Sequence, residues 1–87
     1  LERWQTLSKH DQLLHIGAEI KRAAVWQNKD KEKFELAINQ ALALVELSLQ
    51  DLKWRPQSHF LLGLKDELRK FFDGEKTESI EILYLAL

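Results

Sequence analysis

The chain has 87 residues, a formal net charge of −1 and no cysteine, and 45% of its residues are hydrophobic against 31% charged. These values predict one folded domain over residues 1–87, without disulfides or cysteine-based zinc sites, and favour a cytoplasmic location. The small net charge provides no general attraction for nucleic acid, and no apolar run reaches the roughly 20 residues that a membrane span needs.

The first long helix is expected over residues 9–27. Ser8 is a suitable N-cap, with Asp11 at the third helical position. Gly17 lies on the apolar face, where it would allow a close approach of another helix. The apolar stripe consists of Leu13, Ile16, Gly17, Ile20 and Ala24.

A second helix is expected over residues 31–53, with Asp30 as its N-cap. Its apolar residues cover more of its circumference than one neighbouring helix can bury, so the sequence predicts self-association as a homodimer. One stripe contains Phe34, Ile38, Ala41, Val45, Ser48 and Leu52, and a second side contains Leu36, Ala43 and Leu47.

Two further helices are expected over residues 56–73 and 78–87. Pro56 suits a first helical turn, because proline lacks the N–H that such a turn cannot pair, and Gly74 suits a helix end. Both segments carry apolar stripes. Four helices with short connections predict an all-α fold, an antiparallel up-down-up-down four-helix bundle.

In this topology the stretch Lys53–Phe60, "KWRPQSHF", is a corner of the bundle. We call the end of the bundle at which this corner lies the pole. Helix starts and ends meet there, and they bring together most of the side chains that could bind or react. Trp4, His10 and Trp54 are candidate ligand-binding residues, and Arg55 and His59 are candidate catalytic residues. The pole is expected to collect Trp4, His10, Trp54, Arg55, His59 and Tyr84.

A small helical bundle with an arginine and a histidine at the start of a late helix resembles the HEPN family. Many members of that family dimerise and cut RNA without metal, through an arginine and a histidine separated by four to six residues. Others lack the motif and are partners of minimal nucleotidyltransferases. Here three residues separate Arg55 from His59, and one of them is Pro56, so the match to the motif is partial.

Arg55 and His59 have a chemical and a structural interpretation. A histidine can act as general base on a ribose hydroxyl while an arginine grips the phosphate, provided that the two residues lie one helical turn apart. Alternatively, Arg55 pairs with Asp51 or with the preceding helix end, and His59 is simply exposed. No metal is expected, because His10 and His15 do not share a helix face, and no motif indicates a cofactor.

Three functional hypotheses follow. The first is a homodimeric interaction protein without catalysis, a HEPN-like partner of a nucleotidyltransferase-type protein. The second is a metal-independent ribonuclease with Arg55 and His59 at a dimer cleft, which leaves binding of nucleic acid open. The third is a small-ligand or nucleotide binder at Trp4 and Trp54. Convergence of Arg55 and His59 in one shared cleft lined by both subunits would favour the ribonuclease, and their separation on open surface would favour the interaction protein.

Overall fold

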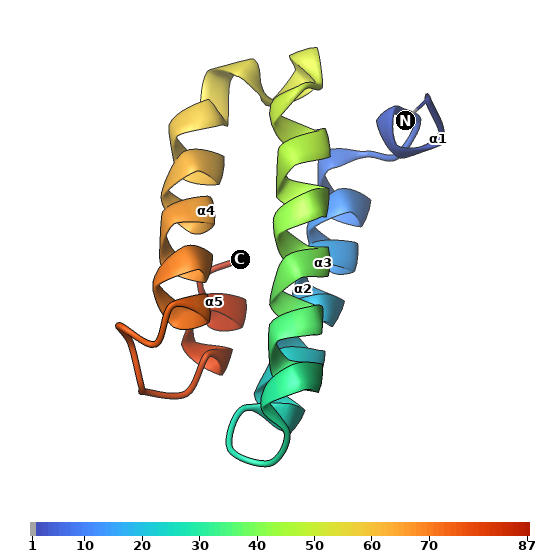
Figure 1. Cartoon of the computed structure of the whole chain (residues 1–87). Coiled ribbons are helices and arrows are strands. Elements are labelled where there is room, and N and C mark those ends of the chain that lie inside the picture. The colour runs from blue at the N-terminus through green and yellow to red at the C-terminus, as the bar shows by residue number, and fades with distance from the viewer. Residues whose placement is uncertain (1) are drawn as a thin grey trace.

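A computed structural model describes residues 2–87 of the chain, and the side chains of residues 3–87 (Figure 1). All regular elements in these residues are helices, so the predicted all-α class is confirmed. None of these helices is both long enough and apolar enough to cross a membrane. The elements are α1 (Glu2–Gln5), α2 (Lys9–Trp26), α3 (Lys31–Leu49), the 3-10 helix η1 (Leu52–Gln57), α4 (Ser58–Phe72) and α5 (Glu81–Leu85).

The three long helices alternate in direction, and α3 packs between α2 and α4 (Figure 1). The short helix α5 packs on α2. A β-carbon built on Gly17 would lie 3.2 Å from Leu87 Cδ1, so the chain ends beside the middle of α2. A fourth helix therefore accompanies the three long ones over only part of their length.

Local sequence signals set the starts of α2 and α3 and the turn after α4 as predicted. The Ser8 side chain accepts a hydrogen bond from the Asp11 N–H (3.1 Å), and the Asp30 side chain accepts one from the Lys33 N–H (3.1 Å). Gly74 follows α4 with φ +80°, a conformation that side-chain-bearing residues rarely adopt. The two hydrogen bonds cap the starts of α2 and α3, and the Gly74 conformation turns the chain away at the end of α4.

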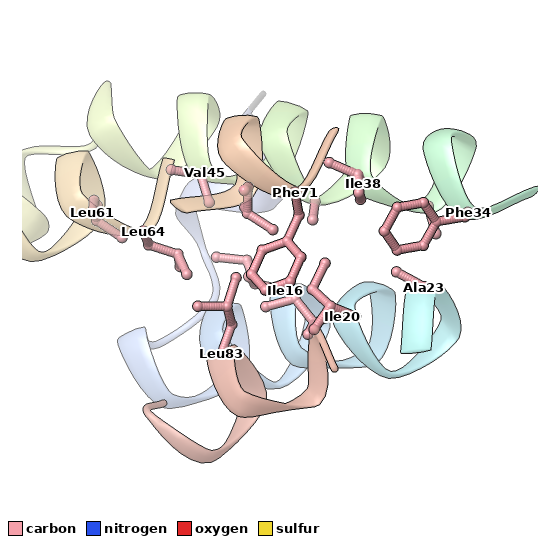
Figure 2. Packing of buried hydrophobic residues seen from close by; sticks show 14 of the residues in the cluster. Ile16, Ile20, Ala23, Phe34, Ile38, Val45, Leu61, Leu64, Phe71 and Leu83 are labelled. Atoms are coloured by element: carbon pink, nitrogen blue, oxygen red, sulfur yellow. The ribbon is translucent and has the colours of Figure 1, made fainter. Parts of the chain in front are cut away.

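The core runs along the axis between the long helices and is closed on one side by α5. Phe71 reaches from α4 toward Ile16 and Ile20 of α2, and Leu83 of α5 lies on the same side (Figure 2). The predicted stripes of all four segments contribute to it. Its buried apolar members include Ile16, Ile20, Phe34, Ile38, Ala41, Val45, Leu61, Leu64, Leu68, Phe71, Ile80 and Leu83.

The second helix is shorter than predicted, ending at Leu49 rather than at residue 53. The chain continues as η1, a 3-10 helix that contains both Arg55 and Pro56. The Asp51 side chain caps η1 by accepting from the Lys53 N–H (3.1 Å), and this local hydrogen bond competes with continuation of α3. Leu52 consequently leaves the core stripe and is 73% exposed. The third helix begins at Ser58 rather than at residue 56.

The last helix is also shorter than the predicted 78–87, spanning only Glu81–Leu85. Gln27 supplies the physical reason, because its side chain holds the preceding backbone outside the helix. Its amide nitrogen donates to the Glu78 carbonyl (2.7 Å) and its amide oxygen accepts from the Ile80 N–H (2.8 Å). Helix α1 was not predicted, and its single turn is anchored by the buried ring of Trp4.

Candidate functional site

Two tryptophans enter the core at the pole from different elements. Trp4 comes from α1 and is 9% exposed, and Trp54 comes from η1 and is 3% exposed. The Trp4 indole N–H donates to the Ser48 hydroxyl (3.1 Å), and the Trp54 indole N–H donates to the side-chain oxygen of Gln12. Both polar ring atoms are therefore engaged inside the protein.

Gln12 is fully buried and is the centre of a polar network. Its amide nitrogen donates to the Trp4 carbonyl (2.8 Å) and to Asp51 Oδ2 (3.3 Å). Asp51 also accepts from Lys53 Nζ (2.6 Å), which in turn donates to the Gln5 carbonyl (2.8 Å). The hydrogen bond from Lys53 is the main cause that lowers the pKa of Asp51 below its usual value. The network joins α1, α2 and η1.

This buried network is saturated within the described side chains, where every buried side-chain nitrogen or oxygen has a hydrogen-bond partner. Sequence reasoning selected Trp4 and Trp54 as ligand-binding residues, and the structure places them in a packed cap. It did not single out Gln12. The available signal was position, because Gln12 lies four residues before Ile16 on the core face of α2, where a polar side chain implies a buried partner.

The candidate catalytic residues lie on two different elements. Arg55 is in η1 and His59 is in the first turn of α4, and both side chains are exposed. Because η1 is a 3-10 helix, the one-turn relation of a continuous α-helix does not hold between them. His59 lines a hollow between α4 and α5, and Arg55 lies outside the set of residues that line it. The predicted alternative partner of Arg55, Asp51, pairs with Lys53.

His10 and Tyr84 line one hollow between α2 and α5, although only His10 lies at the pole. The prediction that Tyr84 lies at the pole is wrong, because α5 is too short to reach it. The Tyr84 ring lies against Gly17, and Lys21 Nζ is 4.7 Å from its centroid. A hydrogen bond from Lys21 to Glu81 (2.7 Å) holds this side of α5 and raises the pKa of the lysine.

Two hollows flank α5, and together we call them the α5 groove. The hollow toward α2 has a volume of about 470 Å³ and the hollow toward α4 about 370 Å³. Leu87 lines both hollows. The first is lined by His10, Leu13, Leu14, Ala18, Lys21, Tyr84, Leu85 and Leu87, and the second by His59, Phe60, Gly63, Leu64, Asp66, Glu67, Leu83, Ala86 and Leu87.

The walls of the α5 groove are mainly aliphatic and aromatic, with two histidines at the pole end and with Lys21, Asp66 and Glu67 farther along. Within residues 2–87 no three histidine, aspartate or glutamate side chains are grouped so that they could hold a metal ion.

Comparisons with known proteins identified no relative, so the function of this chain is interpreted from its geometry. No family model matches the chain, and searches of curated proteins and of solved structures found no similar protein. The HEPN-like resemblance therefore stays a prediction.

Proposed function

We propose that this chain is a protein-interaction module that acts as a homodimer and has no catalysis of its own. The observation that carries the proposal is a second seam on the outer face of α3, opposite the core face. Its members follow one another at spacings of four, three and four residues, which is the spacing of a coiled-coil seam. They are Leu36, Gln40, Ala43 and Leu47. Leu36 is 58% exposed, Gln40 and Ala43 are exposed, and Leu47 is half-buried against the edge of the core.

The seam is complementary to itself in an antiparallel pair. A two-fold axis between Gln40 and Ala43 places Leu36 of one copy against Leu47 of the other. The same axis places Ala43 against Gln40, and the small alanine allows the two helices to approach closely. A single stripe on one helix thus supplies both halves of an isologous contact.

The arrangement of the candidate catalytic residues supports an interaction role over a ribonuclease. Arg55 lies in η1 and His59 in α4, and of the two only His59 lines the hollow between α4 and α5. The tryptophans beside them are engaged in the buried network. We also propose that the fold is an up-down four-helix bundle whose last helix is short, formed by α2, α3, α4 and α5. A nucleotidyltransferase-type partner remains part of the HEPN-like prediction.

Sedimentation velocity at micromolar concentration tests the dimer. We expect wild type to sediment with twice the chain mass of 10.3 kDa. Ala43→Glu puts a charge at the centre of the seam and should give a monomer with unchanged helicity. Leu62→Glu is the matched control, because Leu62 is 52% exposed on α4, away from the seam.

Either of two results would contradict the proposal. One is a wild-type monomer under these conditions. The other is an Ala43→Glu protein that dimerises as well as wild type does.

A further inference from the structure

A hollow of about 320 Å³ lies between α2 and α3, beside the outer seam of α3, which we call the α3 seam. Leu36 and Gln40 belong to the α3 seam and also line this hollow, so the two surfaces are continuous. The lining consists of Glu19, Arg22 and Trp26 from α2 and of Lys33, Leu36, Ala37 and Gln40 from α3.

The four lining residues from α3 follow the spacing i, i+3, i+4 and i+7. Residues at this spacing are neighbours on a helix surface, and in a coiled coil four such residues form the hole that receives one side chain of the facing helix. The hollow therefore has the form of such a hole, with α2 as an additional wall.

We propose that this hollow receives Leu47 of a second copy of the chain, so that α2 joins α3 in the homodimer interface. The inference rests on the proposed homodimer and specifies which surfaces form it. With the two-fold axis between Gln40 and Ala43, Leu47 of the second copy comes opposite Leu36, which lines the hollow. The same axis generates this contact twice in the dimer.

The size of a stable dimer interface requires more than the α3 seam. Stable interfaces bury on the order of 800 Å² per partner and involve roughly 20 or more residues on each side. Four residues along one helix fall well short of this size, so the interface must continue onto a neighbouring surface. The hollow supplies that continuation, because it is bordered by residues of α2.

The two sides of the α3 seam differ in polarity. On the side of α4 the seam is bordered by Asn39 and Glu46, which lie seven residues apart, and Glu46 pairs with Lys65 of α4. On the side of α2 it is bordered by the half-buried ring of Trp26 and by the buried Ala37. A leucine from the second copy therefore buries more apolar surface on the side of α2.

The charged groups on the walls of the hollow already have partners. Arg22 donates to both carboxylate oxygens of Glu19 (2.7 and 3.0 Å), and Lys33 Nζ lies 4.2 Å from the centroid of the Trp26 ring. The two-fold axis places Lys33 opposite Gln50 of the second copy, which carries no charge. Docking of a leucine thus leaves these charges paired and brings no like charge against Lys33.

Cysteine cross-linking tests the contact, because the chain contains no cysteine of its own. Chains carrying Arg22→Cys are mixed with chains carrying Leu47→Cys and treated with a short bis-maleimide at micromolar concentration. We expect a covalent dimer that joins positions 22 and 47, identified by mass spectrometry of the linked peptides. Arg69→Cys mixed with Leu47→Cys is the matched control and should give no such product, because Arg69 is exposed on α4 and does not line the hollow.

Truncation of the inserted side chain gives a second measurement. Leu47→Ala should raise the dissociation constant of the dimer about tenfold or more, measured by sedimentation equilibrium. Leu49→Ala is the matched control and should dimerise like wild type. Leu49 is also half-buried, but it lies two residues farther along α3, which places it on the opposite side of the helix.

Two results would overturn the inference while leaving the homodimer in place. One is a protein that sediments as a dimer but gives no cross-link between Arg22→Cys and Leu47→Cys. The other is equal dimerisation of Leu47→Ala and Leu49→Ala. A monomeric wild type would instead overturn the homodimer and this inference with it, so the two kinds of failure are distinguishable.

Discussion

At the scale of single residues, Gln12 is the buried polar side chain on which the hydrogen-bond network at the pole is centred. A glutamine is rarely fully buried, because both ends of its amide need partners. Here the oxygen accepts from Trp54, and the nitrogen donates to the Trp4 carbonyl and to Asp51. The side chain therefore specifies how α1 and η1 dock on α2, in addition to filling space.

Replacing Gln12 tests this role. Gln12→Ala removes three hydrogen bonds, leaves the Trp54 indole N–H buried without a partner and opens a cavity. We expect a loss of about 2–4 kcal/mol in the free energy of unfolding, measured by urea denaturation followed by circular dichroism. Gln5→Ala is the control, because Gln5 is exposed and uses its backbone carbonyl in the network. Equal stability of the two variants would show that the network contributes little.

At the scale of elements, the docking of α5 depends on the glycine at position 17 of α2, which has no side chain. A β-carbon on Gly17 would lie 3.1 Å from Tyr84 Cε1, closer than ordinary van der Waals contact. The close approach lets Ile80 and Leu83 become buried, at 0% and 8% exposure. The predicted role of Gly17 as a point of close helix approach is thereby confirmed, with α5 as the approaching helix.

Gly17→Leu should displace α5. Leucine favours helix over glycine by almost 1 kcal/mol, but its side chain would occupy the space of the Tyr84 ring and expose Ile80 and Leu83. We expect a net loss of about 2–4 kcal/mol in the free energy of unfolding, measured by chemical denaturation.

Gly63→Leu is the matched control for this change. The same helix-propensity gain applies at Gly63, and its position is open, so this variant should be as stable as wild type or slightly more stable. A Gly17→Leu protein as stable as Gly63→Leu would mean that α5 contributes little to the fold.

At the scale of the whole molecule, the chain combines a saturated core with two unpartnered apolar surfaces. The core and the polar network at the pole have buried polar atoms that are already paired. The α3 seam and the α5 groove expose aliphatic side chains on different sides of the protomer. This distribution is typical of a protein that binds other chains, and it is the basis on which we favour interaction over catalysis.

The ribonuclease hypothesis has a direct test at this scale. Pure protein incubated with labelled single-stranded RNA in EDTA should leave the RNA intact, because Arg55 and His59 lie on different elements and of the two only His59 lines the hollow between α4 and α5. The double variant Arg55→Ala/His59→Ala should give the same result as wild type. Cleavage of the RNA by wild type, together with loss of cleavage in His59→Ala and also in Arg55→Lys, would contradict the interaction proposal and establish the catalytic pair.

The all-helical class, the starts of α2 and α3 at their N-caps Ser8 and Asp30, and the turn at Gly74 were predictable from the amino-acid sequence alone. These features depend on contacts within three or four residues and on apolar periodicity, which a single chain segment contains in full. The buried stripe of α4 was predictable for the same reason. Its periodic residues Leu61, Leu64, Leu68 and Phe71 are all buried.

Only the tertiary structure decided where the shorter elements end and what the pole contains. Gln27 stops the last helix from starting early through hydrogen bonds to residues more than 50 positions away, and Gln12 meets Trp54 across 42 positions. These hydrogen-bond partners depend on how the helices pack, so no local sequence pattern indicates them. The same reason explains why Arg55 and His59, four residues apart in the chain, lie on different elements. Arg55 belongs to η1, whose 3-10 turn replaces the continuous α-helix that their spacing assumed, and His59 belongs to α4.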